Sequence, residues 1–358
     1  MTKKRAKKSS ASELPLTDGF VEQPHAPWDS EQMPRFAGVP RFLRLPSHDL
    51  SSGVPEVDVL LCGVPFDVGT SFRPGARLGP RAIREASALA RRFNPALGID
   101  IYSELAVADG GDLPLSPHEV DLAMGMVTQC AEALARSGVV GGYVGGDQTL
   151  TLAALRGIHR AKLKQVGLVH FDSHSNTAPA AWGKDAHHGS AIRVAIEEGL
   201  VRPNQCLQVG IRGPYSHEGD LAFAVGCGVE IVSVDEIKWD LHSVVGQLRD
   251  MARKGVVYLS VDLSVLDPAY APGVGIPCPG GLTTWELQQL LRALVGAELV
   301  GFDVVEVAPP YDVGGITSLA AVTVLQEILA VIADTRRSGR PASSKGTPTR
   351  RSSGRVSP

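Results

Sequence analysis

The chain has 358 residues, of which 44% are hydrophobic and 20% charged, and its net charge is −3. These values are typical of soluble globular proteins and exclude a wholly disordered chain. No apolar run approaches the ~20 residues of a membrane span, and the first residues lack the apolar core of a signal peptide, so we expect no membrane partner and no secretion. The five cysteines have no paired spacing, which fits a reducing compartment and predicts a cytoplasmic protein.

Both ends of the chain are basic. Residues 1–12 contain five Lys and Arg, residues 336–358 contain seven, and neither segment contains an acid. Their Ser-, Pro- or Gly-rich composition predicts disordered tails, and because short charge runs are usually only solvated, nucleic acid is not expected as a partner. Residues 13–335 are predicted to form a single domain. The Pro-rich segment 13–56 is expected to be an arm that lies on the domain or on a neighbouring subunit.

Short apolar runs alternate with helical patterns along the rest of the chain. Six runs have the β-branched, apolar character of strands covered on both faces. They are Val57–Gly63, Val139–Val144, Val166–Phe171, Gln208–Ile211, Val256–Val261 and Leu299–Val305.

Helix signals lie between these runs. Ser116–Glu119 has the pattern of a capping box with Pro at the first helical position, and Gly138 is expected to end that helix. Thr283–Glu286 opens a second helix in the same way, and Gly296 is expected to close it. Helices that cross between parallel strands predict an α/β protein with three layers, α/β/α, around a mostly parallel sheet.

Polar residues follow four of the predicted strands, and these clusters are Gly145–Thr149, Asp172–Asn176, Asp262 and Glu306. In an open parallel sheet, ligands bind at the carboxyl ends of the strands. One such Asp would mean little, because Asp caps helices routinely. Four polar strand ends together predict a functional site at one edge of the sheet.

The spacing of Asp172 and His174 is that of two metal ligands, because residues i and i+2 of an extended segment point the same way. Asp262 can approach from the adjacent strand end. Two carboxylates and one imidazole leave positions open for water, as in catalytic metal sites. The alternative is that His174 is a buried, hydrogen-bonded histidine. The matching positions of Asp262 and Glu306 favour the metal site.

Longer stretches of the sequence are similar to a known family. These stretches are Gly63–Ser71, Arg73–Pro80, Asp262–Gly281 and Glu306–Asp312. The chain resembles the ureohydrolases, the agmatinases and arginases, from about Phe36 to Ile332, and is most similar to the agmatinase branch. The resemblance implies the arginase/deacetylase fold, a cytosolic homo-oligomer (trimer or hexamer) and a place in polyamine metabolism. It also implies hydrolysis of a small cationic guanidino substrate to urea and an amine at a binuclear Mn²⁺ centre.

The implied site residues carry over only in part. Gln148 stands where the family has a metal-binding His, and Asn176 and Ser264 stand where it has metal-binding Asp residues. Three of the six implied ligands are therefore replaced. Glu306, at the guanidinium-binding position, and His188, at the proton-shuttling position, are kept.

The replacements change the charge of the implied metal site. Two divalent ions that lie close together need bridging and flanking carboxylates to offset their repulsion, and two of these carboxylates are gone. Two filled metal positions are therefore not expected. The surviving Asp172, His174 and Asp262 match the ligand set of single-zinc deacetylases in the same superfamily. We expect one divalent ion per chain there, Mn²⁺ in the first place, with Zn²⁺ or Ni²⁺ as alternatives.

Three functional hypotheses follow. The leading one is a metal-dependent hydrolase of a guanidino compound, with an atypical mononuclear site, Glu306 holding the substrate and His188 moving protons. The second is a catalytically silent relative that binds a guanidino ligand or pairs with a partner subunit. The third is a mononuclear, deacetylase-like amide hydrolase. In each case we expect the loop Thr177–His187 and the N-terminal arm to contact the ligand's tail.

Overall fold

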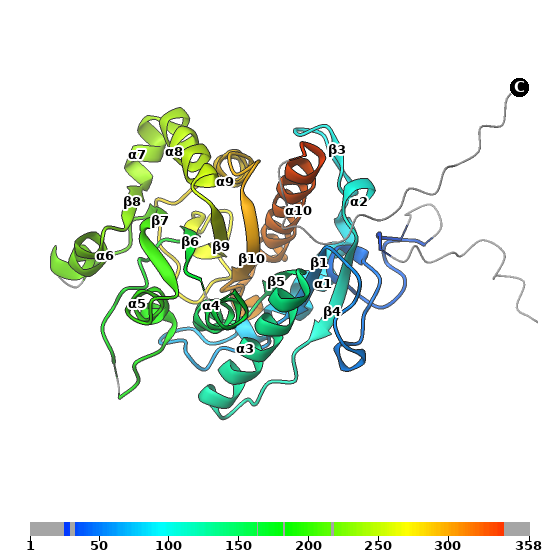
Figure 1. The fold of residues 1–358 in the computed structure, drawn as a ribbon, viewed down its shortest axis with the longest axis horizontal. Helices are drawn as coiled ribbons and strands as arrows, with labels where there is room; N and C mark the ends of the chain where they lie inside the picture. Colours follow the sequence, from blue (N-terminus) through cyan, green and yellow to red (C-terminus); the bar gives the residue numbers. More distant parts are fainter. Residues whose placement is uncertain (1–24, 29–32, 163, 182, 216–217, 340–358) are drawn as a thin grey trace, which may run out of the picture.

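The computed structural model describes residues 25–28, 33–162, 164–181, 183–215 and 218–339. Its centre is a parallel sheet with the strand order β4-β1-β5-β10-β9-β6-β7-β8 (Figure 1). The strands of this sheet are β1 (Val59–Gly63), β4 (Val107–Asp112), β5 (Val140–Val144), β6 (Val166–Phe171), β7 (Val201–Ile211), β8 (Glu230–Ser233), β9 (Val256–Asp262) and β10 (Glu298–Val305). A two-stranded antiparallel hairpin, β2 (Phe93–Asn94) and β3 (Ile99–Asp100), lies apart from it.

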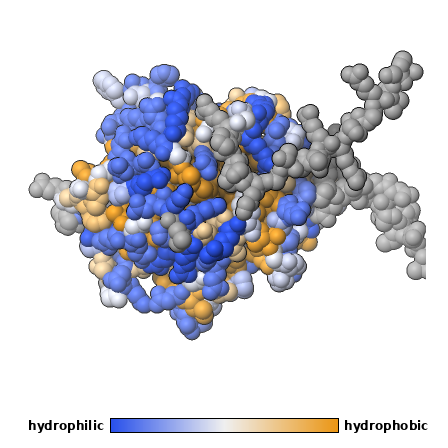
Figure 2. Space-filling model, viewed as in Figure 1, coloured by the Kyte–Doolittle hydropathy of each residue, from blue (hydrophilic) through white to orange (hydrophobic). Residues whose placement is uncertain are grey.

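Helices cover both faces of the sheet and bury one apolar cluster on each. One layer contains α3 (Val120–Ser137), α4 (Thr149–Lys162), α5 (Ala191–Glu197) and α6 (Ala222–Cys227). The other contains α1 (Gly79–Ala86), α2 (Ile101–Glu104), α7 (Val234–Trp239), α8 (Leu241–Arg253), α9 (Thr284–Arg292) and α10 (Ile316–Arg337). The predicted three-layer α/β/α architecture is confirmed. Hydrophilic residues cover much of the face shown in Figure 2.

Helix α10 is long and apolar enough to cross a membrane by length and composition, contrary to the expectation that no apolar run approaches that length. In the structure, 72% of its most apolar window is buried. The helix packs against α1, α2 and α9, so its composition is that of a core helix. Its last turn reaches Arg337, two residues into the predicted C-terminal tail, and Arg336 forms an ion pair with Asp58. Residues 1–12 and 340–358 lie outside the described part of the chain.

The predicted helix starts have different outcomes. The capping box at Thr283 is present, because its hydroxyl accepts from the Glu286 N–H and the Glu286 carboxylate accepts from the Thr283 N–H. The prediction at Ser116 was wrong by one turn. Its hydroxyl does accept two backbone N–H groups, but the helix begins only at Val120. Gly138 ends that helix with a left-handed φ of 78°, as expected.

The order of the strands brings the four polar clusters together. β5, β10, β9 and β6 are consecutive neighbours at the centre of the sheet, so their carboxyl ends form one edge. The turn after β5 passes through Gly146 with φ 74°, where a Cβ would lie 2.6 Å from the carbonyl oxygen of Val64. Only glycine fits this left-handed, crowded position. The turn delivers Asp147 and Gln148 to the start of α4.

Candidate functional site

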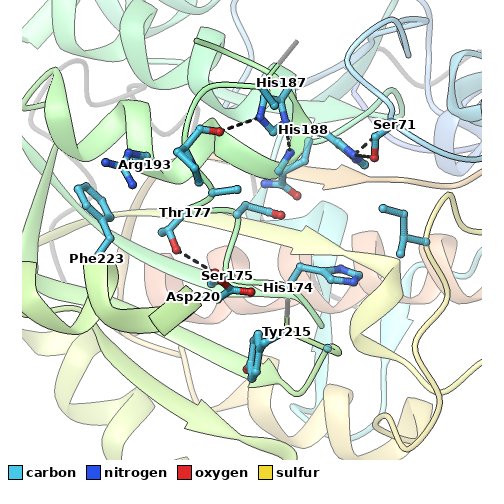
Figure 3. Close-up of a pocket in the computed structure, with 18 of the residues that line it drawn as sticks. Ser71, His174, Ser175, Thr177, His187, His188, Arg193, Tyr215, Asp220 and Phe223 are labelled. Carbon is cyan, nitrogen blue, oxygen red and sulfur yellow. Dashed lines mark hydrogen bonds between the residues drawn. The ribbon is translucent and has the colours of Figure 1, made fainter. Parts of the chain in front are cut away.

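A cavity of about 640 Å³ opens at this edge of the sheet (Figure 3). Its size suits a small ligand. The inner wall carries Gln148, His174, Asn176, His188, Asp262, Ser264 and Glu306. The outer wall carries Ser71, the loop around Thr177 and His187, and Arg193, Tyr215, Asp220 and Phe223. The predicted loop therefore does line the cavity, and the structure brings the sequence-predicted site residues together.

Glu306 leaves β10 in a left-handed conformation, with φ 66°. A side chain other than glycine adopts this conformation at some cost, and such residues cluster at functional sites. The strain is held by two contacts, because the Glu306 N–H donates to Gly146 O (2.9 Å) and its Oε1 accepts from the Gln148 N–H (3.0 Å). The carboxylate is 4% exposed and faces the cavity.

His188 lies against Glu306, with Nδ1 3.3 Å from Oε1. Its other ring nitrogen, Nε2, accepts from the Ser71 N–H (3.2 Å) and lies 2.8 Å from the Ser71 hydroxyl. The proton of the neutral ring is therefore on Nδ1 and points at Glu306. Burial lowers the pKa of His188, but the hydrogen bond and charge of Glu306 outweigh it and raise that pKa above its ordinary value.

Asp172 is fully buried and surrounded by donors. Its Oδ1 accepts from the Ser264 hydroxyl (2.9 Å) and the His174 N–H (2.9 Å), and its Oδ2 accepts from the Asn176 Nδ2 amide (2.6 Å). Burial raises its pKa, but the nearby imidazole rings of His170 and His174 lower it below the ordinary range. Asp172 is therefore a stable carboxylate whose two oxygens are both engaged by side chains of this chain.

Asp262, at the end of β9, has a pKa shifted in the opposite direction from that of Asp172. Its Oδ1 accepts from the Ser264 N–H (2.6 Å), but burial and the nearby charges of Asp172 and Glu306 raise its pKa well above the usual value. Like charges in a dry site disfavour ionisation of the second carboxyl. Asp172 and Asp262 therefore differ strongly in their tendency to carry charge.

The replaced positions do not fit the pair of metal ions that the resemblance implies. The Ser264 hydroxyl and the Asn176 amide each turn a donor toward Asp172, which places N–H and O–H hydrogens where a cation would have to lie. Within the described ranges, no three His, Cys, Asp or Glu side chains converge as ligands of one ion would. The single-ion site at Asp172, His174 and Asp262 stays a prediction, as does the choice of Mn²⁺.

The Arginase family model matches residues 57–331. The chain belongs to the arginase family. It is 40% identical to the guanidinopropionase of Pseudomonas aeruginosa over 310 residues, which cover 86% of this chain and 96% of that one. It is 36% identical to the mitochondrial agmatinase of Gallus gallus, over 86% of this chain and 90% of that one. The solved structure of proclavaminate amidinohydrolase from Streptomyces clavuligerus superposes with a TM-score of 0.80 at 38% identity, covering 84% of this chain and 99% of that one.

These arginase-family relatives agree with the resemblance drawn from the sequence, and the arginase α/β fold is confirmed. They are hydrolases of guanidino compounds by name. The homo-oligomer and the cytoplasmic location stay predictions.

Several residues of the site were not singled out from the sequence. Ser71 lies in a stretch that carried the resemblance, and only the fold shows that it contacts His188. Asp303, which does not line the cavity but accepts hydrogen bonds from Thr151 and Ser260, is an acid inside the apolar β10, a signal that could have drawn attention to it. Arg193 and Phe223 belong to ordinary amphipathic segments and gave no signal.

Proposed function

We propose that this chain binds a small guanidino acid in the cavity at the strand ends and that it lacks the two-metal hydrolysis that the resemblance implies. The observation that carries the proposal is the closed set of hydrogen bonds from Asn176 and Ser264 to Asp172, in place of open metal ligands. The retained pair of Glu306 and His188 supports binding of a cationic group. The family membership supports the guanidino class.

The outer wall of the cavity supports a ligand that also carries a carboxylate. The guanidinium carbon of Arg193 lies 4.0 Å from the centre of the Phe223 ring, and its Nε donates to Glu197 (2.9 Å). The N–H groups of Ile192 and Arg193 donate to the carbonyl oxygen of Asn176, so the start of α5 is tied to the inner wall. A fixed arginine on an aromatic ring suits a carboxylate, whereas agmatine would place an ammonium there.

Slow hydrolysis with one metal ion is the second candidate. It is favoured by the retained contact between His188 and Glu306, the residues that the resemblance assigns to proton shuttling and guanidinium binding. Two of the implied metal-site carboxylates are replaced, so the site lacks the negative charge that would hold a second ion, and we expect such turnover to be weak.

Two assays on the full chain separate these candidates. Calorimetric titration of chelator-treated protein with 3-guanidinopropionate, 4-guanidinobutyrate and agmatine measures binding. Urea release from the same compounds, with and without Mn²⁺, measures hydrolysis, and acetylated amines serve as the control for deacetylase-like activity. The proposal predicts binding of the guanidino acids without metal and little or no urea. Rapid urea release at neutral pH would contradict it.

A further inference from the structure

The side chain of Gln148 is held by two hydroxyl groups beneath the cavity. Its Nε2 donates to Thr151 Oγ1 (2.8 Å) and to Ser260 Oγ (2.9 Å), and the residue is 1% exposed. Thr151 lies on α4 and Ser260 on β9, so the amide is fixed between two separate elements. Both hydrogens of the amide are thereby directed into the protein core.

The orientation of the Gln148 amide is set by where these two hydroxyl groups donate their protons. Thr151 Oγ1 and Ser260 Oγ donate to the two carboxylate oxygens of Asp303 at 2.7 Å each, and the Tyr258 hydroxyl donates at 2.8 Å. A hydroxyl group has a single proton, and an ionised carboxylate can only accept. With their protons committed to Asp303, Thr151 and Ser260 can only accept from Gln148. The amide is therefore fixed with its carbonyl oxygen turned away from them.

That carbonyl oxygen, Gln148 Oε1, is buried and accepts no hydrogen bond from any residue that the structure describes. The residue lines the cavity, and its own N–H donates to the carboxylate of Glu306. A buried carbonyl without a donor is costly, and at Gln148 the two hydroxyl groups fix this orientation in a residue that lines a cavity, where a ligand can supply the donor. Gln148 and Glu306 both line the inner wall of the cavity.

We propose that Gln148 Oε1 accepts a hydrogen bond from the guanidinium group of the ligand, so that the cationic group itself takes the place of a metal ion beside Glu306. Thr151, Ser260 and Asp303 are the positioning residues that aim this oxygen. The inference rests on the proposed guanidino ligand and deepens it. A planar guanidinium has N–H groups on several sides and can donate to Glu306 and Gln148 at once. Because the amide of Gln148 is neutral, it orients the guanidinium group without adding another negative charge beside the carboxylates of the site.

The test is calorimetric titration of the chelator-treated full chain with 3-guanidinopropionate. Gln148→Met removes the acceptor at similar length, and we expect its Kd to rise at least about tenfold, as for the loss of a hydrogen bond to a charged group. The matched control is Gln247→Met on α8, where the amide oxygen is also buried without a partner but lies outside the cavity lining. It should bind within about twofold of the wild type.

A second set of variants tests the positioning. Ser260→Ala and Thr151→Val leave Gln148 in place but loosen its amide, and each should raise Kd by about two- to fivefold. These effects should disappear in the Gln148→Met background, which a general packing defect would not do. If Gln148→Met fails to fold, the Kd of Ser260→Ala alone tests the proposal. Wild-type-like affinity of the variants, with normal binding by the wild type, would overturn this inference alone. Absence of binding by the wild type would overturn it together with the proposed function.

Discussion

Asn176 Nδ2 lies 2.6 Å from Asp172 Oδ2. An aspartate at position 176 would repel Asp172 unless a cation lay between them, whereas the amide supplies a hydrogen that binds Asp172 directly. Compared with the aspartate that the resemblance implies, the amide therefore needs no metal ion beside Asp172. The Ser264 hydroxyl likewise donates to the other oxygen of Asp172. Without any ion, this part of the site is electrostatically satisfied.

Restoring the three ligands should restore metal binding. After loading with Mn²⁺ and desalting, we expect the wild-type chain to retain at most one ion, and the variant Gln148→His, Asn176→Asp, Ser264→Asp to approach two. Each single change should do less, because one added ligand leaves the charge unbalanced. Elemental analysis measures the stoichiometry. Two tightly held ions in the wild-type chain would contradict the account of the site.

Arg193 should select for a carboxylate on the ligand. In Arg193→Gln, we expect the affinity for 3-guanidinopropionate to fall at least about fivefold while the affinity for agmatine stays the same or rises. The matched control is Arg156→Gln, because Arg156 also pairs with a glutamate, Glu198, but outside the cavity lining. Equal losses for both ligands would indicate that Arg193 only supports the fold of the wall.

Asp303 should make stability depend on pH. Burial raises its pKa to about 6, although three hydroxyl groups donate to it. A carboxyl whose pKa is raised on folding favours the native state fully below its unfolded pKa of 3.8, and this contribution is lost as the pH rises through about 6. The loss amounts to about 2–3 kcal/mol.

Urea unfolding of the wild type and of Asp303→Asn between pH 4 and pH 8 isolates this effect. The wild type should lose stability relative to the variant as the pH rises through about 6. A difference that is constant across this range would show that Asp303 titrates elsewhere.

Much of this arrangement follows from the sequence, because strands buried on both faces are largely apolar and the polar clusters that follow them mark their ends. All six predicted strands are present, whereas β4 and β8, the edges of the sheet, were missed. Edge strands need less apolar surface, and β4 reads Val-Ala-Asp-Gly-Gly-Asp. The sequence also indicated the residues of the inner wall of the cavity, but not Ser71, Arg193 or Phe223. The hydrogen bonds of the inner wall could not be predicted, because whether Asn176 faces Asp172 or a metal depends on the relative placement of segments distant in the chain.

The extent of the C-terminal helix gives a prediction about the tails. Removing residues 1–12 and 340–358 should change the melting temperature little, since these segments lack apolar surface that could offset the entropy of ordering. Removing everything beyond residue 335 should lower it further, because the ion pair of Arg336 with Asp58 is lost. Thermal unfolding of both truncated chains measures the difference. A large loss in the shorter deletion would show that the tails pack on the domain.

The central claim is that the cavity binds a guanidino acid without a metal ion. The most direct measurement is the calorimetric isotherm of 3-guanidinopropionate on the full chain after chelation, compared with the same chain supplied with Mn²⁺. The account predicts one site per chain in both cases, with Kd values that agree within about twofold. Binding that appears only after Mn²⁺ is added would contradict it. That result would show that a metal ion binds at the site despite Gln148, Asn176 and Ser264.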